Sequence, residues 1–506
     1  MTVTAGPIAV RRSEWKTVLS SAAGLTIILA IVHAALSIAV NAIVLINDDG
    51  ILYVTAARLA AGGHLGEAWE AFKWPAYPLL IGGFSAITGL DALVAAKALN
   101  TLASVATFLI LLRVTWELGK ERRLIVCCGM LLLTHLWWND LRGLVVRDHL
   151  FLMFMSAGIL FQVRDLAVPS TAYKLGFVLT GLLAAAFRIE ALAFVVLVPL
   201  LRLSSETKDK RIRYAAIAIA CLAPVIAAPF GMAFWNASGR LATVMSIVDH
   251  RFDALREILA PWSVNRWFAA YVSIVLGLTV YGLVKAVGAV PILLGAYYGR
   301  QAKVGTAWRA YQLAIWYGVA GAIIAAIELF FTMDYAPRYG LLISFAVTIP
   351  AAFGLASHYE QCRRARRPDL FTRTLAALVI ILMGYGLVGG VHLRERQAFV
   401  HEAAQWLSAN VHKPNQVLSN NNQVMFYAGL PRANSDFLLN SALLPSVAGL
   451  YDWKRYEYVV LHVREDRRNF IDEISRELGS KPVVSFENSR GDRIEIFRGV
   501  TDAPIS

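Results

Sequence analysis

The sequence predicts an α-helical, polytopic membrane protein that ends in a small α/β domain. Hydrophobic residues make up 57% of the 506 residues and charged residues only 16%, whereas about a quarter of the residues in a soluble globular protein are charged. Apolar runs long enough to cross a hydrocarbon core of about 30 Å recur through residues 1–392. Over residues 393–506 the charges mix and short alternating segments appear, as in a small α/β domain. We therefore expect a transmembrane domain at 1–392 and an α/β domain at 393–506.

About eleven apolar runs are candidate membrane spans. They are separated by short loops rich in Arg, Trp and Pro, residue types that gather at membrane boundaries. The first run is longer than the apolar region of a signal peptide, so we expect it to remain as an anchor. The expected spans are residues 20–46, 92–117, 124–138, 149–163, 174–187, 191–201, 214–233, 267–299, 310–331, 339–358 and 374–391.

The distribution of basic residues predicts the orientation of these spans. The segments between spans form two alternating sets, one with 21 Lys or Arg in 73 residues and the other with 10 in 99. Because basic loops stay in the cytoplasm, the N-terminus is expected inside, and residues 47–91 and the α/β domain outside. The net charge of +13 follows the same insertion rule, so nucleic-acid binding is not expected. The basic set is 1–19, 118–123, 164–174, 202–213, 300–309 and 359–373.

The first outer loop, residues 47–91, is expected to form amphipathic juxtamembrane helices. Charges, the stretch "AAGGHLGEAWE" and the two prolines of "WPAYP" interrupt its apolar segments. Short amphipathic helices separated by such breakers fit the outer membrane surface, where Trp69 and Trp74 would lie at the level of the headgroups.

Asp48 and Asp49 begin this loop and are the first candidate catalytic residues. One interpretation is structural, because an Asp caps a helix well and favours its N-terminus. A single Asp would suffice for that role. Two adjacent carboxylates repel each other, which favours proton uptake by one of them and suits a general base. The sequence leaves both interpretations open.

A second group of charges lies in the next outer loop, in "HLWWNDLRGLVVRDHLFLMF". Asp140, Arg142, Arg147 and Asp148 fall within about ten residues. They could pair locally at a membrane boundary. Alternatively, Asp148 and the carboxylates of the first loop face one outward cleft, because consecutive spans are usually neighbours in space.

Two further outer segments carry candidate donor-binding residues. Arg188 and Glu190 lie between apolar flanks in "AAAFRIEALAF", where an ionisable side chain normally faces a partner or a polar cavity. Arg338 and Tyr339 follow Pro337 at the outer end of a span. An arginine fork donates two hydrogen bonds to a phosphate, although the tyrosine also fits an interfacial aromatic belt. The histidines and cysteines show no metal-ligand spacing, and no metal is assigned.

The order of these motifs resembles the GT-C class of membrane glycosyltransferases. The similarity is to the branch that includes protein O-mannosyltransferases and the bacterial lipid A aminoarabinose and galacturonic acid transferases. The matching segments are "DDGILY", with Tyr53 four residues beyond Asp49, then the glycine pair at Gly62 and Gly63, "KWPAYPLL", "RDHLF", "FRIEALAF", "PRYGLLISFAV" and the helix "FVHEAAQWLSANV". They cover nearly the whole chain in order. The sequence departs from the pattern at Gly50, where an acidic residue is usual, and at the Arg that precedes Asp148.

The resemblance implies inverting transfer of a sugar from a polyprenyl-phosphate carrier to a lipid, glycan or protein acceptor in the periplasm. Asp49 would be the base, with Asp48 as the alternative, and Asp148 would shape the site. Arg338, Arg188, Arg147, Tyr339, Glu190 and Tyr53 would bind the donor and its lipid phosphate.

The resemblance also implies a place in a bacterial inner membrane. No cofactor is firmly expected, and participation of a divalent metal stays open. Two alternatives also stay open: a non-catalytic transporter or flippase for a lipid or sugar, and a membrane-anchored receptor whose tail binds the ligand.

Overall fold

The fold is described from a computed structural model of the chain. The structure describes residues 21–206, 267–299, 306–332, 337–365, 370–391, 398–413, 416–431, 456–465 and 469–499, with a few isolated residues between 207 and 266. The chain divides into two compact units. The helical unit comprises residues 1–38, 73–142 and 146–391, and the mixed unit comprises residues 39–72, 143–145 and 392–506.

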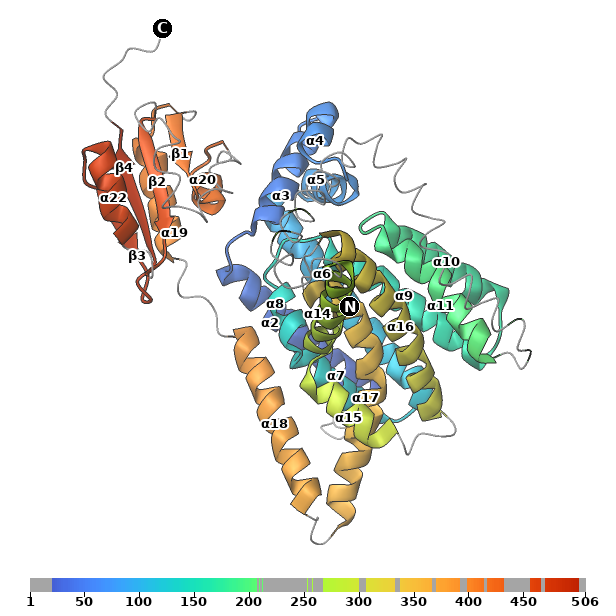
Figure 1. The fold of residues 1–506 in the computed structure, drawn as a ribbon. Coiled ribbons are helices and arrows are strands. Elements are labelled where there is room, and N and C mark those ends of the chain that lie inside the picture. The colour runs from blue at the N-terminus through green and yellow to red at the C-terminus, as the bar shows by residue number, and fades with distance from the viewer. Residues whose placement is uncertain are drawn as a thin grey trace, which may run out of the picture. The chain divides into compact units, whose positions relative to one another are not determined.

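The helical unit is a bundle of helices (Figure 1). Six helices of the described chain are long and apolar enough to cross a membrane, as expected of a multi-pass membrane protein. The helices are α2 (Ala22–Ile43, which continues into the mixed unit), α5 (Ala76–Thr88), α6 (Ala92–Gly119), α7 (Arg122–Leu133), α8 (Leu136–Leu141), α9 (Asp148–Ala167), α10 (Thr171–Ala185), α11 (Glu190–Glu206), α14 (Trp267–Val287), α15 (Ala289–Gly299), α16 (Thr306–Thr332), η1 (Pro337–Gly340), α17 (Leu341–Arg364) and α18 (Leu370–Val391).

Helices occupy every predicted span that falls within the described residues, and the span predicted at 214–233 lies outside them. The prediction of one continuous span at 124–138 is wrong, because α7 ends at Leu133 and α8 begins at Leu136. The Asn139 amide donates to the carbonyls of Leu133 and Gly386, at 3.0 Å each. The first bond satisfies a carbonyl at the end of α7 that a continuous helix would have paired internally.

The expected span at 267–299 is also divided, into α14 and α15. Gly288 separates them with φ +83°, a left-handed conformation that ends a helix and that glycine adopts without strain. The 11 residues of α15 give a length of only about 16 Å, too short to cross a membrane by itself. An apolar composition could not distinguish this break from a continuous span.

The mixed unit begins with the end of α2 and the helices α3 (Asp48–Ala61) and α4 (Leu65–Ala71). Helices were expected in this loop, and they are present. Asp48 and Asp49 lie in the first turn of α3, where carboxylates favour the positive end of the helix dipole. The Asn47 side chain accepts a hydrogen bond from the backbone N–H of Val145 at 2.8 Å, which fixes the start of α3 against residues 143–145.

Gly50 lies where residues 143–145 approach α3 most closely. A Cβ at Gly50 would come within 2.8 Å of the Cβ of Val145 and 2.9 Å of the Asn47 side-chain oxygen. The position therefore has no room for a side chain.

The C-terminal part of the mixed unit contains a four-stranded sheet with strand order β1-β2-β4-β3. β2 pairs in parallel with β1 and antiparallel with β4, and β3 pairs antiparallel with β4. Buried apolar clusters that include Val460 and Val459, consecutive residues of β2, show that both faces of this strand are covered. The elements are α19 (Ala398–Asn410), β1 (Val417–Ser419), α20 (Asn422–Tyr427), β2 (Tyr458–Val463), α22 (Asn469–Leu478), β3 (Val484–Glu487) and β4 (Arg493–Arg498).

Candidate functional site

Arg188 is the centre of a buried ionic cluster in the helical unit. Its Nη1 donates to Asp148 Oδ1 at 2.6 Å and its Nη2 donates to Glu190 Oε1 at 2.5 Å. The side chains of Arg188 and Asp148 are 7% and 6% exposed. Burial opposes the charge of Arg188, but the carboxylates of Glu190 and Asp148 raise its pKa above the ordinary value. The cluster joins the start of α9, the α10–α11 connection and the start of α11.

Aromatic rings cover the Arg188 guanidinium. Its Cζ lies 4.1 Å from the ring centroid of Tyr339 and 5.7 Å from that of Phe151, so both rings are within cation–π range. Arg338 approaches the same tyrosine, with its Cζ 5.5 Å from the centroid. The structure therefore brings together five residues that the sequence analysis had selected from separate segments: Asp148, Arg188, Glu190, Arg338 and Tyr339.

A pocket opens beside Arg188. Apolar side chains form most of its wall, and Arg188, two carboxylates and Tyr339 supply a few polar groups, the composition usual for a small-molecule site. Glu328 of α16 was not selected from the sequence, because it lies inside a long apolar run with no polar neighbour. The lining residues are Phe151, Arg188, Glu190, Phe194, Gly321, Ile324, Ala325, Glu328 and Tyr339.

Further cations lie within electrostatic range of this cluster. Arg338 and Arg147 both act on the charge of Asp148, and Arg147 also acts on Glu190. No local pairing of Asp148 with Arg142 or Arg147 occurs as an ion pair among the described residues, since Asp148 pairs with Arg188, 40 residues away. The expectation of local Arg–Asp pairs is therefore wrong for Asp148.

Asp48, Asp49 and Tyr53 belong to the mixed unit. Asp48 is exposed and Asp49 is half-buried at the start of α3. Tyr53 is buried, with its ring edge-on to Phe72 at 4.9 Å between centroids. The cleft expected between Asp148 and the first-loop carboxylates would join the two units, and it stays a prediction.

A polar chain in the interior of the helical unit was missed in the sequence. Arg142 donates from Nη2 to His33 Nδ1 at 2.9 Å, and His33 Nε2 lies 2.9 Å from the Ser104 hydroxyl. His33 is 0% and Arg142 3% exposed. Burial lowers the pKa of Arg142 to about 10. No sequence signal linked His33 to Arg142, because 109 residues separate them.

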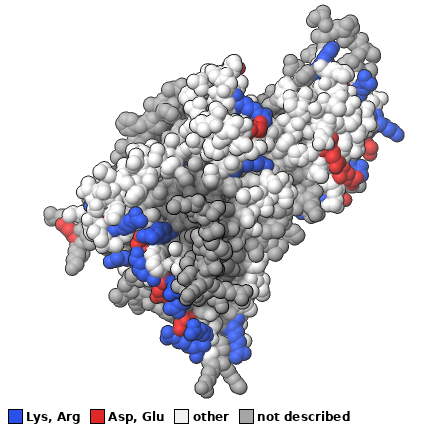
Figure 2. Space-filling view, turned by 180° about the vertical axis from the view of Figure 1, so that it is seen from behind, with Lys and Arg blue, Asp and Glu red and all other residues white. Residues whose placement is uncertain are grey.

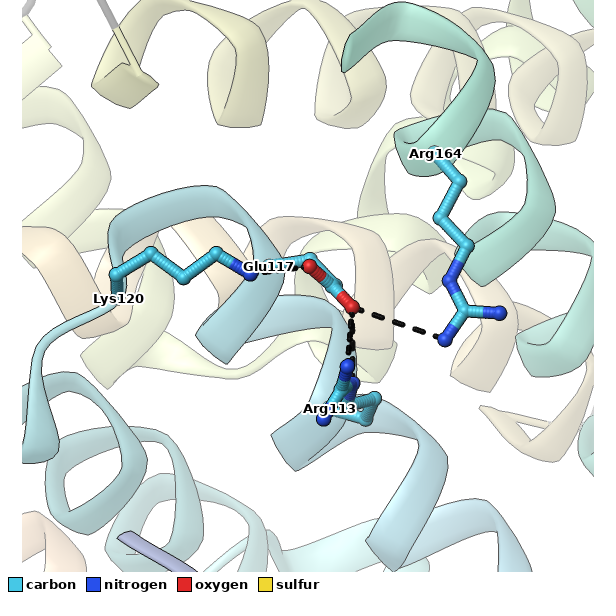
Figure 3. Close-up of polar contacts among 4 residues, drawn as sticks. All are labelled: Arg113, Glu117, Lys120 and Arg164. Carbon is cyan, nitrogen blue, oxygen red and sulfur yellow. Dashed lines mark hydrogen bonds and ion pairs between the residues drawn. The ribbon is translucent and has the colours of Figure 1, made fainter. Parts of the chain in front are cut away.

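The opposite end of the helical unit is basic. Glu117 at the end of α6 accepts from Arg113 at 2.6 Å, contacts Lys120 and lies 3.6 Å from Arg164 of α9 (Figure 3). Blue side chains with interspersed red ones gather toward the lower edge of the helical unit in the space-filling view (Figure 2). Further ion pairs tie α7 to α17 and α9 to α11 at this end: Arg123 with Glu360, and Arg202 with Asp165.

Helix α9 relates the two ends. Asp148 is its first residue and Arg164 lies in its last turn. Twenty residues at about 1.5 Å each give about 30 Å, which is the thickness of a hydrocarbon core. The ends of α6, α9, α11 and α17 therefore lie at one end of the helical unit, and the Arg188 cluster lies at the other.

Among the residues that the structure describes, no group of three or more His, Cys, Asp or Glu side chains is arranged to hold a metal ion. The groups at the Arg188 cluster can bind an anion or orient a polar substrate.

Comparison with known proteins gives matches among solved structures, two of which are structures of one archaeal enzyme. No protein-family model and no curated protein matches the sequence. The two structures are of the Archaeoglobus fulgidus oligosaccharyltransferase, one tethered through a disulfide bond to an acceptor peptide containing the NVT sequon and one in complex with zinc and sulfate. Identity is 12% in both, with TM-scores of 0.43 and 0.42. The matches cover 95% and 94% of this chain and 75% and 74% of the archaeal chain. A likeness of this size does not establish a shared fold or activity.

Proposed function

We propose that the chain is an inverting glycosyltransferase that moves a sugar from a polyprenyl-phosphate carrier to an acceptor on the outer face of the membrane. The observation that carries this proposal is the pocket at Arg188, an apolar cavity with a few charged groups, at the end of the helical unit opposite the basic end. A lipid-linked sugar needs such a site, because its headgroup lies at the membrane surface while its isoprenoid chain stays between helices.

The reaction needs a base for the acceptor and cations for the leaving group. The acceptor's hydroxyl or amine attacks the anomeric carbon, the bond from that carbon to the phosphate oxygen breaks, and the electron pair leaves with polyprenyl phosphate. The acceptor's proton passes to Asp49, with Asp48 as the alternative base. A phosphate monoester leaves readily, so stabilising its charge matters more than protonating it.

Arg338 and Arg147 would stabilise the departing phosphate together with Arg188. Asp148 and Glu190 orient Arg188, because each accepts a hydrogen bond from a different terminal nitrogen of its guanidinium. Such a fork presents its remaining N–H groups in a fixed direction.

Two tyrosines would complete the donor site. Tyr339 would cover the donor beside Arg188, and Tyr53 would support the first loop. A divalent metal remains an open addition to this scheme.

The acceptor would be lipid A, another glycolipid, a polysaccharide or a protein, and nucleic acid is not expected. The chain would lie in a bacterial inner membrane with a cytoplasmic N-terminus and a periplasmic α/β domain. The basic ends of α6, α9, α11 and α17 support this orientation, since basic segments remain in the cytoplasm.

The test is release of polyprenyl phosphate by purified full-length protein. Short-chain polyprenyl-phosphate sugars carrying mannose, galacturonic acid or aminoarabinose are incubated with the protein and a membrane-lipid extract as acceptor, and the products are resolved by mass spectrometry. The wild type should release polyprenyl phosphate from at least one donor. Arg338→Ala should raise KM for that donor, whereas Arg164→Ala, at the other end of α9, should not. Failure of every donor would refute the proposal.

A transporter or flippase is the second candidate, and one observation favours it. His33 lies near the middle of α2 and contacts Arg142 and Ser104, and an ionisable group at such depth often marks a transport path. Proteoliposomes that contain a fluorescent polyprenyl phosphate distinguish the two functions. An impermeant reductant added outside bleaches only the labelled lipid in the outer leaflet. If the labelled lipid of the inner leaflet is bleached as well, without release of sugar, the result would favour the carrier.

A further inference from the structure

The residues directly before the two carboxylates are fixed to the C-terminal part of the mixed unit. Leu45 is 2% exposed and belongs to the same apolar core as Phe399 and Met425. The backbone N–H of Ile46 donates to the Tyr427 hydroxyl at 3.0 Å, and the Gln423 amide donates to the Ile46 carbonyl at 2.7 Å. The start of α3 is therefore held by α20, more than 370 residues further along the chain.

Asn422, the first residue of α20, contacts Asp48. Its Nδ2 donates to Asp48 Oδ1 at 3.1 Å. Asn422 is 5% exposed, and its own position is fixed because the Asn421 side chain accepts from the backbone N–H of Val424 at 3.0 Å. The donor that faces Asp48 is consequently rigid, whereas Asp48 itself is exposed.

Packing does not explain the amide at this position. The Oδ1 of Asn422 is buried and has no hydrogen-bond partner among the described residues. An unpaired buried acceptor costs free energy, and an apolar side chain of similar size would avoid that cost. The amide provides an N–H group directed at Asp48, and leucine would not.

The direction of Asp48 determines that of its neighbour. Consecutive residues of an α-helix point about 100° apart around its axis. With Asp48 turned toward α20, Asp49 is directed to a different side of α3. The contact with Asn422 is therefore made by Asp48, although the sequence presents the two carboxylates as a symmetric pair.

We infer that Asn422 is a positioning residue that holds Asp48 and thereby fixes the first turn of α3, which also carries Asp49, the proposed base. The inference rests on the proposed function and adds to it a division of labour between the two carboxylates. It also gives the C-terminal α/β domain a role in the reaction, since the domain carries the donor that sets the first-loop geometry.

A side-chain exchange tests the inference. Asn422→Asp places two carboxylates against each other, whereas Asp48→Asn/Asn422→Asp restores the hydrogen bond with its polarity reversed. We expect Asn422→Asp to lower the melting temperature of the full-length protein and to reduce kcat for polyprenyl-phosphate release about tenfold, the effect of losing one hydrogen bond to a charged group. KM for the donor should change by less than about threefold, and the exchange should restore both readouts. Gln405→Glu, the same amide-to-acid change at an exposed position of α19, is the matched control and should change neither.

The possible outcomes separate the inference from the proposed function. An exchange that restores neither readout refutes the contact. An exchange that restores the melting temperature while kcat stays as low as in Asn422→Asp shows that Asp48 itself does the chemistry, which overturns the assignment. If the wild type releases no polyprenyl phosphate from any of the three donors, the proposed function fails, and the melting temperatures still decide whether Asn422 holds Asp48.

Discussion

Replacing Arg188 by glutamine would leave Asp148 and Glu190 without the cation that both now contact. The Asp148 side chain is 6% exposed and that of Glu190 26%, so water can compensate little for the first carboxylate. Removing one partner of a buried ion pair costs about 3–5 kcal/mol. Asp148→Asn should cost less, about 1.5–3 kcal/mol, because Arg188 keeps its bond to Glu190 at 2.5 Å.

Thermal unfolding of the purified protein in detergent measures this order. Arg188→Gln should have the lowest melting temperature, and that of Asp148→Asn should lie between it and the wild type. The double variant Arg188→Gln/Asp148→Asn should melt above Arg188→Gln, because one of the two carboxylates left without a cation is then neutral. Arg164→Gln is the control. It removes a long contact, at 3.6 Å, from a partly exposed glutamate that keeps Arg113 and Lys120 (Figure 3), and the loss should cost less than about 1 kcal/mol.

Two results would refute this reasoning. If Asp148→Asn melted as low as Arg188→Gln, the arginine would not be shared between two carboxylates. If the double variant melted below Arg188→Gln, removal of the orphaned charge would have brought no relief, and the ionic account of the cluster would be wrong.

Three further predictions follow from close contacts and burial. Gly386→Ala should destabilise the protein strongly, because its Cβ would clash with the backbone carbonyl of Thr134 at the α7–α8 break, whereas Gly384→Ala in the same helix meets nothing within 4 Å; melting temperatures of the pair check this. Gly50→Ala should cost about 1–3 kcal/mol through overpacking, and equal stability to the wild type would contradict the close approach at α3. Burial lowers the pKa of His462, so the folded state favours the neutral imidazole. The free energy of unfolding should therefore fall as the pH drops below about 6.5, where the unfolded chain takes up the proton. Hydrogen exchange of β2 in the intact protein, corrected for intrinsic rates, should show this loss in the wild type and not in His462→Gln.

The positions of the helices could be predicted from the sequence, but their interruptions could not. An apolar run long enough to span a membrane predicts a helix, because unpaired backbone groups are costly in hydrocarbon. The same rule does not predict the break after Leu133, where α7 ends and Thr134 separates it from α8. At that break the Asn139 amide donates a hydrogen bond to the carbonyl of Gly386, which lies 247 residues further along the chain.

The residue types of the candidate site could be predicted better than their partners. Arg188, Glu190 and Asp148 stood out as charges beside apolar segments, since such charges are rare and functional. Their mutual ion pairs were not predicted, because they depend on how α9 and α11 pack. Asn422 carried the least signal of all, as one asparagine among three in a polar turn. Its contact with Asp48 appears only when the two ends of the chain are brought together.

The most direct test of the central claim is the rate of polyprenyl-phosphate release by Asp49→Asn against that of the wild type. Both proteins are purified from membranes, matched for melting temperature and supplied with the donor that the wild type accepts. Loss of a general base lowers the rate about 10²- to 10⁴-fold, and a loss of that size in an otherwise stable variant is the predicted result. Release by Asp49→Asn at the wild-type rate would contradict the claim that this carboxylate activates the acceptor.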